Sequence, residues 1–96
     1  MKPSEALRRH RTEILALATR HRAHNVRVFG SAARGDDRDD SDLDLLVEFG
    51  LDASLFDAFA LQEELEALLA LKVELATPGG LHPLIRTAVM RDARPL

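Results

Sequence analysis

The chain has no cysteine, tryptophan or tyrosine among its 96 residues. Without cysteine it can form neither a disulfide nor a thiolate zinc site, and it has no cysteine nucleophile. Its four phenylalanines are too few for a base-stacking platform of the kind that single-stranded nucleic acids use. The net charge of −3 argues in the same direction, because affinity for nucleic acids rests on neutralising phosphates with basic side chains. We therefore expect no direct nucleic-acid binding.

Long hydrophobic runs are also missing. No apolar run approaches the roughly 20 residues that a membrane-spanning helix requires, and residues 1–6 lack the apolar core of a signal peptide. We expect a cytoplasmic protein without a membrane segment. The hydrophobic content of 46% is enough for one modest core, and the length suits a single domain over residues 1–96. An enzyme of this size has no room for a separate substrate-binding domain, so its acceptor is expected to bring its own binding surface.

The apolar periodicity predicts an α/β (α+β) fold in the order helix, strand, short helix, strand, helix, strand, helix. A small twisted mixed sheet flanked by helices is the expected architecture. Asn25 is expected to break the first helix, and Ser4 and Ser54 are predicted N-caps. The predicted helices are 4–21, 32–34, 54–70 and 81–91, and the predicted strands are 26–29, 42–49 and 72–76. On the predicted helix 54–70, the face expected to be buried consists of Leu55, Ala58, Leu61, Leu65 and Leu68.

Six aspartates lie between positions 36 and 44, directly before an apolar strand. An acidic run usually forms a solvated loop. Asp42 and Asp44 are two residues apart on the predicted strand, so both should point to the same face, where two carboxylates can share one Mg²⁺. The remaining four are assigned to the loop and are expected to do little beyond solvation: Asp36, Asp37, Asp39 and Asp40.

A Gly-Ser step, Gly30-Ser31, ends the first predicted strand. At such a step, free backbone N–H groups and a hydroxyl can meet an anion. Ten residues separate Ser31 from Asp42, which gives the pattern Gly-Ser-x10-Asp-x-Asp. Two other phosphate or metal motifs are excluded. A P-loop requires a Gly-Lys step, which the sequence lacks, and an EF-hand loop that starts at Asp40 would need glycine and glutamate where the chain has Leu45 and Leu51.

This pattern, within "GSAARGDDRDDSDLDLLVEF", resembles the minimal nucleotidyltransferases (MNT proteins) of the DNA polymerase β-type nucleotidyltransferase superfamily. The resemblance extends to "LKVELATPGGLHPLIRTAVMRDARPL" and so covers nearly the whole chain. It implies a nucleotidyltransferase fold with three groups of site residues. These are Gly30 and Ser31 on the triphosphate, Arg34 and Gly35 beside the nucleotide, and Asp42, Asp44 and Glu74 as metal ligands and catalytic carboxylates.

At Glu74 the chain departs from the family, which usually has aspartate there. The resemblance assigns this third carboxylate to the second metal ion and to the proton of the nucleophile. Glutamate is longer by one methylene, and a misplacement of about 1 Å can cost on the order of 100-fold in rate. The departure bears on turnover more than on fold or partner.

The resemblance implies transfer of AMP from ATP, with two Mg²⁺ ions, to a tyrosine hydroxyl of a HEPN-domain ribonuclease toxin. The chain would then be the antitoxin of a hetero-oligomeric toxin-antitoxin complex. Two alternatives stay open. The chain could mask the toxin by binding alone, with a nucleotide site weakened by Glu74, or it could be a nucleotidyltransferase subunit that acts on a small molecule or RNA.

Overall fold

Four strands form one mixed sheet in the order β3-β2-β1-β4 in the computed structural model, which describes residues 1–96. The central strand β1 runs antiparallel to β2 and to β4, whereas β2 and β3 are parallel. The strand bounds are Ala23–Phe29 for β1, Leu43–Phe49 for β2, Val73–Ala76 for β3 and Arg94–Pro95 for β4. The predicted fold class, a small α/β domain with a twisted mixed sheet, is confirmed.

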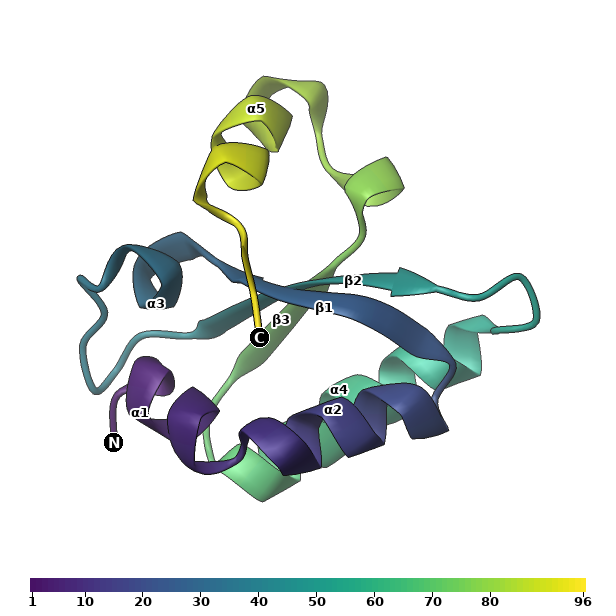
Figure 1. The fold of residues 1–96 in the computed structure, drawn as a ribbon, viewed down its shortest axis with the longest axis horizontal. Helices are drawn as coiled ribbons and strands as arrows, with labels where there is room; N and C mark the ends of the chain where they lie inside the picture. Colours follow the sequence, from purple (N-terminus) through teal and green to yellow (C-terminus); the bar gives the residue numbers. More distant parts are fainter.

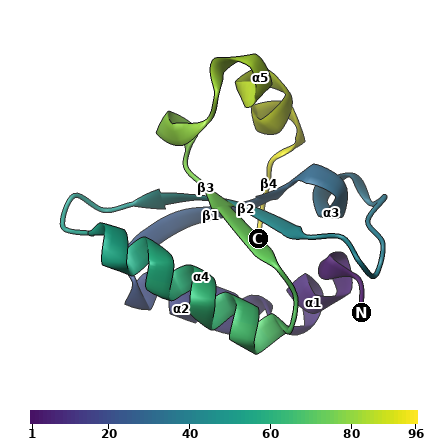
Figure 2. The same cartoon turned by 180° about the vertical axis from the view of Figure 1, so that it is seen from behind.

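Helices lie on both sides of this sheet (Figure 1). Helices α2 and α4 cover one face, and α5 stands over the other face together with the short 3₁₀ turn η1, an arrangement that the reverse view confirms (Figure 2). The helix bounds are Pro3–Arg9 for α1, Arg11–Arg20 for α2, Gly30–Arg34 for α3, Leu55–Leu69 for α4 and Pro83–Asp92 for α5, and η1 is Pro78–Gly80. No helix is long and apolar enough to cross a membrane.

The hydrophobic core lies between the sheet and the α2–α4 layer. Alternate residues of β2 point into it: Leu43, Leu45 and Val47 are all buried and belong to one cluster with residues of α2 and α4. Because successive side chains of a strand point to opposite faces, Asp44 and Leu46 must face the side of α5. The core thus decides which face of the sheet the acidic residues occupy.

The N-terminal region differs from the predicted single helix. The segment forms two helices that meet at His10, whose φ of −116° lies outside the helical range. Lys2, not Ser4, is the N-cap of α1, and the Ser4 backbone N–H instead donates to Asp37 at 2.8 Å. Periodicity could not show this break, because the apolar spacing runs through it unchanged.

The role predicted for Asn25 is also wrong. The helix ends at Arg20 and β1 begins at Ala23, so Asn25 lies inside the strand. Its positive φ of 49° coincides with a register shift between His24 and Arg27 in the pairing with β2. Asparagine tolerates this left-handed conformation better than most residues, which makes it suitable for a bulge.

Helix α4 follows its prediction closely except at its first turn. Ser54 is the N-cap, and its backbone N–H donates to the Asp57 carboxylate at 2.9 Å. Leu61 and Leu65 are buried as expected, but Leu55 is 75% exposed, so the predicted buried face was wrong at its start. The short strand β4 was not predicted, because two residues carry no periodic signal.

Candidate active site

Strand pairing brings the predicted carboxylates to one place on the sheet. In the parallel β2–β3 ladder, Asp44 lies directly opposite Glu74. On its other side Asp44 pairs with Phe29, the last residue of β1. Asp42 immediately precedes β2, two residues before Asp44. Val73, the neighbour of Glu74, is fully buried in the core, so Glu74 points to the opposite face.

The electrostatics of this place are dominated by like charges. Burial and the neighbouring carboxylates of Glu74 and Asp42 raise the pKa of Asp44, and the more distant Arg34 only partly offsets them. The one cation in contact with these carboxylates is the ammonium group of Lys72, which lies 3.6 Å from Glu74 and 4.0 Å from Asp42. Asp44 itself has no ion-pair partner. An additional cation would therefore stabilise the ionised form of all three carboxylates.

Gly30 is required by the position of Asp44. Its φ is +72°, in the left-handed region that glycine adopts without steric cost. A Cβ atom at this position would collide with the Asp44 carboxylate and would lie 3.2 Å from its Cγ. The backbone can approach the carboxylate this closely only because position 30 has no side chain.

The Gly-Ser step opens the short helix α3. Backbone N–H groups in the first turn of a helix have no partner within it, and no side chain caps α3. The Ser31 carbonyl accepts hydrogen bonds from Gly35 and Asp36, at 2.9 and 3.1 Å. Gly35 ends the helix with a φ of +84°, as predicted for the residue that stops this turn. The first turn of α3, which begins at Gly30, thus lies next to the Asp44 carboxylate.

Arg34 is engaged by two carboxylates. Its guanidinium lies 3.4 Å from Asp36 in the acidic loop and 3.2 Å from Asp92 at the end of α5. These hydrogen bonds raise the pKa of Arg34. Its position therefore favours a role in joining α3, the acidic loop and α5, and its predicted place beside the nucleotide stays a prediction.

The residues fit Mg²⁺ in donor chemistry and in charge. Carboxylate oxygens are the hard ligands that Mg²⁺ prefers, and one or two carboxylates with phosphate oxygens and water complete its shell. Asp44 has no ion-pair partner although two carboxylates lie beside it, and burial together with these neighbours raises its pKa; this unpaired carboxylate is the structural observation in favour of a cation. No three acidic or histidine side chains converge as one coordination group, so the predicted three-ligand metal site stays a prediction.

One loop aspartate was assigned the wrong role. Asp37 is only 6% exposed, and it accepts a hydrogen bond from the Ser4 backbone N–H in the first turn of α1. Burial opposes its ionisation, but the hydrogen bonds from Ser4 prevail and lower the pKa of Asp37. A carboxylate at a helix N-terminus also interacts favourably with the helix dipole. Asp37 therefore fastens the acidic loop to α1 and is not merely solvated.

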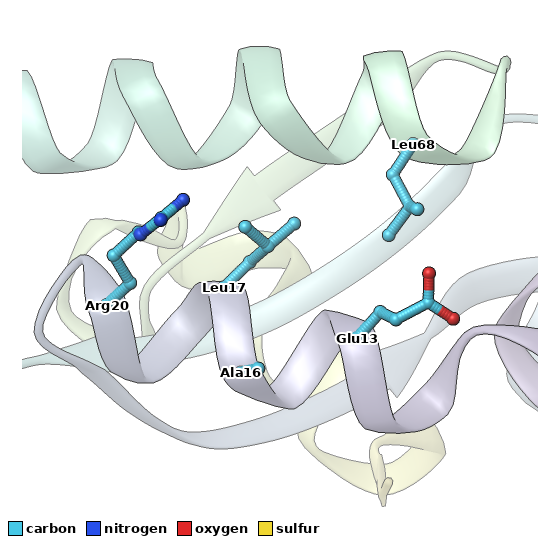
Figure 3. Close-up of a pocket in the computed structure, with 5 residues that line it drawn as sticks. All are labelled: Glu13, Ala16, Leu17, Arg20 and Leu68. Atoms are coloured by element: carbon cyan, nitrogen blue, oxygen red, sulfur yellow. The ribbon is translucent and has the colours of Figure 1, made fainter.

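The pocket in the structure lies elsewhere. A groove of about 420 Å³ runs between α2 and α4 and is lined by Glu13, Ala16, Leu17, Arg20 and Leu68 (Figure 3). It lies on the side of the sheet that α2 and α4 cover, whereas the carboxylates face α5. Its lining has one basic side chain, Arg20, and one carboxylate, Glu13, but neither the Gly-Ser step nor the paired aspartates of the motif, so we place the candidate site at the carboxylates.

Sequence reasoning missed two residues of this region. Lys72 contacts Asp42 and Glu74, and Asp92 holds Arg34. Lys72 could have been found, because it stands two residues before Glu74 and strand alternation places both on one face. No local signal points to Asp92, since it stands 58 positions after Arg34 in the sequence.

Comparison with known proteins points to one family. The family described as "Nucleotidyltransferase domain" matches residues 7–96. The "Protein adenylyltransferase MntA" of Thermococcus cleftensis is 41% identical over 76 residues, which are 79% of this chain and 77% of that protein. The solved structure of a "putative minimal nucleotidyltransferase" superposes with a TM-score of 0.85 at 48% identity, and covers 97% of this chain and 95% of the other.

A more distant structure shares the fold. It is a toxin-antitoxin complex with AMP-PNP, and it superposes with a TM-score of 0.73 at 19% identity over 88% of this chain and 69% of that one. At this identity the similarity shows a common fold only.

Proposed function

Because the chain belongs to the nucleotidyltransferase domain family, we propose that it is a protein adenylyltransferase that transfers AMP from ATP to a tyrosine hydroxyl of a partner HEPN ribonuclease toxin and thereby neutralises it. The observation that carries this proposal is the pairing of Asp44 with Glu74 beside the glycine that Asp44 requires. The Gly-Ser step and the carboxylates are thus neighbours in space as well as parts of one sequence pattern.

The reaction is an in-line displacement at the α-phosphorus of ATP. The acceptor oxygen forms a new bond to phosphorus, the bond to the β-phosphate oxygen breaks, and pyrophosphate leaves. The acceptor's proton goes to a carboxylate, which we assign to Glu74. In such sites Mg²⁺ supplies neutralisation of the charge on the attacking and leaving oxygens.

The chain's own residues would divide the work as follows. Gly30 and Ser31 offer backbone N–H groups and a hydroxyl to the triphosphate, and Gly35 lets the short helix end beside it. Asp42 and Asp44, with Glu74, would hold the cation that accompanies the nucleotide. Arg34 would keep α3 oriented through its two carboxylate partners.

Support for a protein acceptor comes from the relatives. The related MntA protein is a protein adenylyltransferase by name, and the toxin-antitoxin complex that shares this fold contains AMP-PNP.

The test combines the purified chain, Mg²⁺, labelled ATP and its HEPN partner, and locates the label by mass spectrometry. We expect AMP on a tyrosine of the partner. Asp44→Asn should abolish transfer, whereas the matched control Asp40→Asn, an exposed loop aspartate, should not. Transfer at the wild-type rate by Asp44→Asn would contradict the assignment.

A second function is favoured by one observation. The Glu74 side chain is 53% exposed, and its carboxylate is already paired with Lys72. It is also one methylene longer than the aspartate that the family usually has at this position. Under this alternative the chain neutralises the toxin by binding alone. Inhibition of the toxin that is equally strong with and without ATP would support binding alone and contradict AMP transfer as the means of inhibition.

A further inference from the structure

Lys72 lies directly beside two of the three carboxylates. It immediately precedes β3, and its backbone carbonyl accepts a hydrogen bond from Leu43 at 2.9 Å, which extends the parallel ladder by one step. In this register Lys72 lies beside Asp42, just as Glu74 lies opposite Asp44. Strand alternation places the Lys72 and Glu74 side chains on the same face.

The ammonium group bridges two carboxylates of the site. It lies 4.0 Å from Asp42 Oδ2 and 3.6 Å from Glu74 Oε1. No other basic side chain forms an ion pair with either carboxylate, and the nearby Arg34 is bound to Asp36 and Asp92. Lys72 is therefore the only counter-ion in direct contact with this group of acidic residues.

From this geometry we propose that Lys72 competes with divalent cations for Asp42 and Glu74, and so sets the metal affinity of the nucleotide-free protein. The inference rests on the proposed function, which places the cation at these carboxylates. The Lys72 side chain is 64% exposed, so its flexible stem can swing into solvent when a cation enters. The triphosphate of an incoming nucleotide would give the displaced ammonium a new anionic partner.

The size of the effect follows from the charges. A unit positive charge about 4 Å from a divalent cation in water-like surroundings weakens the affinity for that cation roughly 30-fold. Movement of the ammonium away from the ion reduces this opposition. We therefore expect removal of the Lys72 charge to tighten divalent-cation binding by about tenfold.

The experiment measures Mn²⁺ binding without nucleotide or toxin, from the loss of the free-ion signal in electron paramagnetic resonance. Lys72→Met should bind Mn²⁺ about tenfold more tightly than wild type. Lys72→Arg, which keeps the charge, should remain close to wild type. Lys2→Met removes the only other lysine and should also change nothing. Adding Asp42→Asn to Lys72→Met should remove the gain, which locates the ion at this carboxylate.

Circular dichroism and urea unfolding verify that each variant is folded, and Lys72→Gln serves as a second neutral variant. Equal or weaker Mn²⁺ binding by both neutral variants would overturn the proposal, and so would a gain in Lys72→Arg of the same size. Absence of Mn²⁺ binding from every protein would overturn it as well. None of these results requires AMP transfer, so they are distinguishable from a failure of the proposed function.

Discussion

Replacement of Gly30 by alanine should separate the cost of backbone strain from the displacement of a catalytic carboxylate. The added Cβ would collide with the Asp44 carboxylate and would lie 3.2 Å from Cγ and 3.4 Å from Cβ of Asp44. A carboxylate is the end of a short side chain that can rotate, so we expect the collision to be relieved by movement of Asp44. The remaining cost is the left-handed backbone at φ +72°.

The structure contains controls for each part of this cost. Gly35→Ala carries the same kind of strain, with φ +84°, but its Cβ would have no neighbour within 4 Å. Gly79→Ala carries neither strain nor collision. A left-handed non-glycine residue costs about 1–2 kcal/mol, so both Gly30→Ala and Gly35→Ala should lose about that much unfolding free energy. Gly79→Ala should remain within about 0.5 kcal/mol of wild type.

Urea unfolding measures these free energies, and carbon-detected NMR titration of the Asp44 carboxyl group reports its surroundings. Only Gly30→Ala should change the Asp44 titration. It should also lower AMP transfer on the order of 100-fold, because a misplacement of about 1 Å has that effect on a reacting group. If Gly30→Ala keeps the wild-type Asp44 titration and transfer rate, then position 30 does not need to lack a side chain and our account of this contact is wrong.

Three further predictions concern the carboxylates. Because burial and like charges raise the pKa of Asp44, its ionised form destabilises the folded protein above the unfolded value of about 4. Asp44→Asn should therefore be at least as stable as wild type at pH 7, and any gain should vanish below about pH 4, as urea unfolding at the two pH values will show. Glu74→Asp should raise the AMP-transfer rate if side-chain length limits it and lower the rate if the site has adapted to glutamate. An unchanged rate would mean that Glu74 is not the third carboxylate. Asp37→Ala should lose about 1 kcal/mol at pH 7 through the missing hydrogen bond to Ser4, whereas exposed Asp40→Ala should not. Because the pKa of Asp37 is lowered in the folded state, its stabilisation should be complete above about pH 4 and should disappear as the pH falls through the folded pKa.

The distribution of charge around the site suggests why the acidic run is tolerated. Of its six aspartates, Asp37 accepts a hydrogen bond from the first turn of α1, and Asp36 forms an ion pair with Arg34. Asp42 shares Lys72 with Glu74. Asp44 alone is half-buried without an ion-pair partner, and it is one of the two aspartates for which the sequence pattern predicted a shared cation.

Rules that relate residues a few positions apart predicted much of this structure from the sequence alone. Strand alternation placed Asp44 on the face opposite Leu43 and Leu45, and the core confirms that placement. Turn chemistry marked the end of α3 at Gly35 and the start of α4 at Ser54, because each depends on residues only a few positions apart. The Gly-Ser-x10-Asp-x-Asp spacing identified the family before any contact was known.

Tertiary structure alone decided how these pieces meet. The break at His10, the burial of Asp37 against α1 and the pairing of Arg34 with Asp92 join residues that are far apart in the chain or carry no local signal. The alignment of Asp44 with Glu74 depends on the register of a parallel ladder across 30 residues. Such a register is set by backbone hydrogen bonds and by the packing of buried side chains between distant segments, and no periodicity within either strand encodes it.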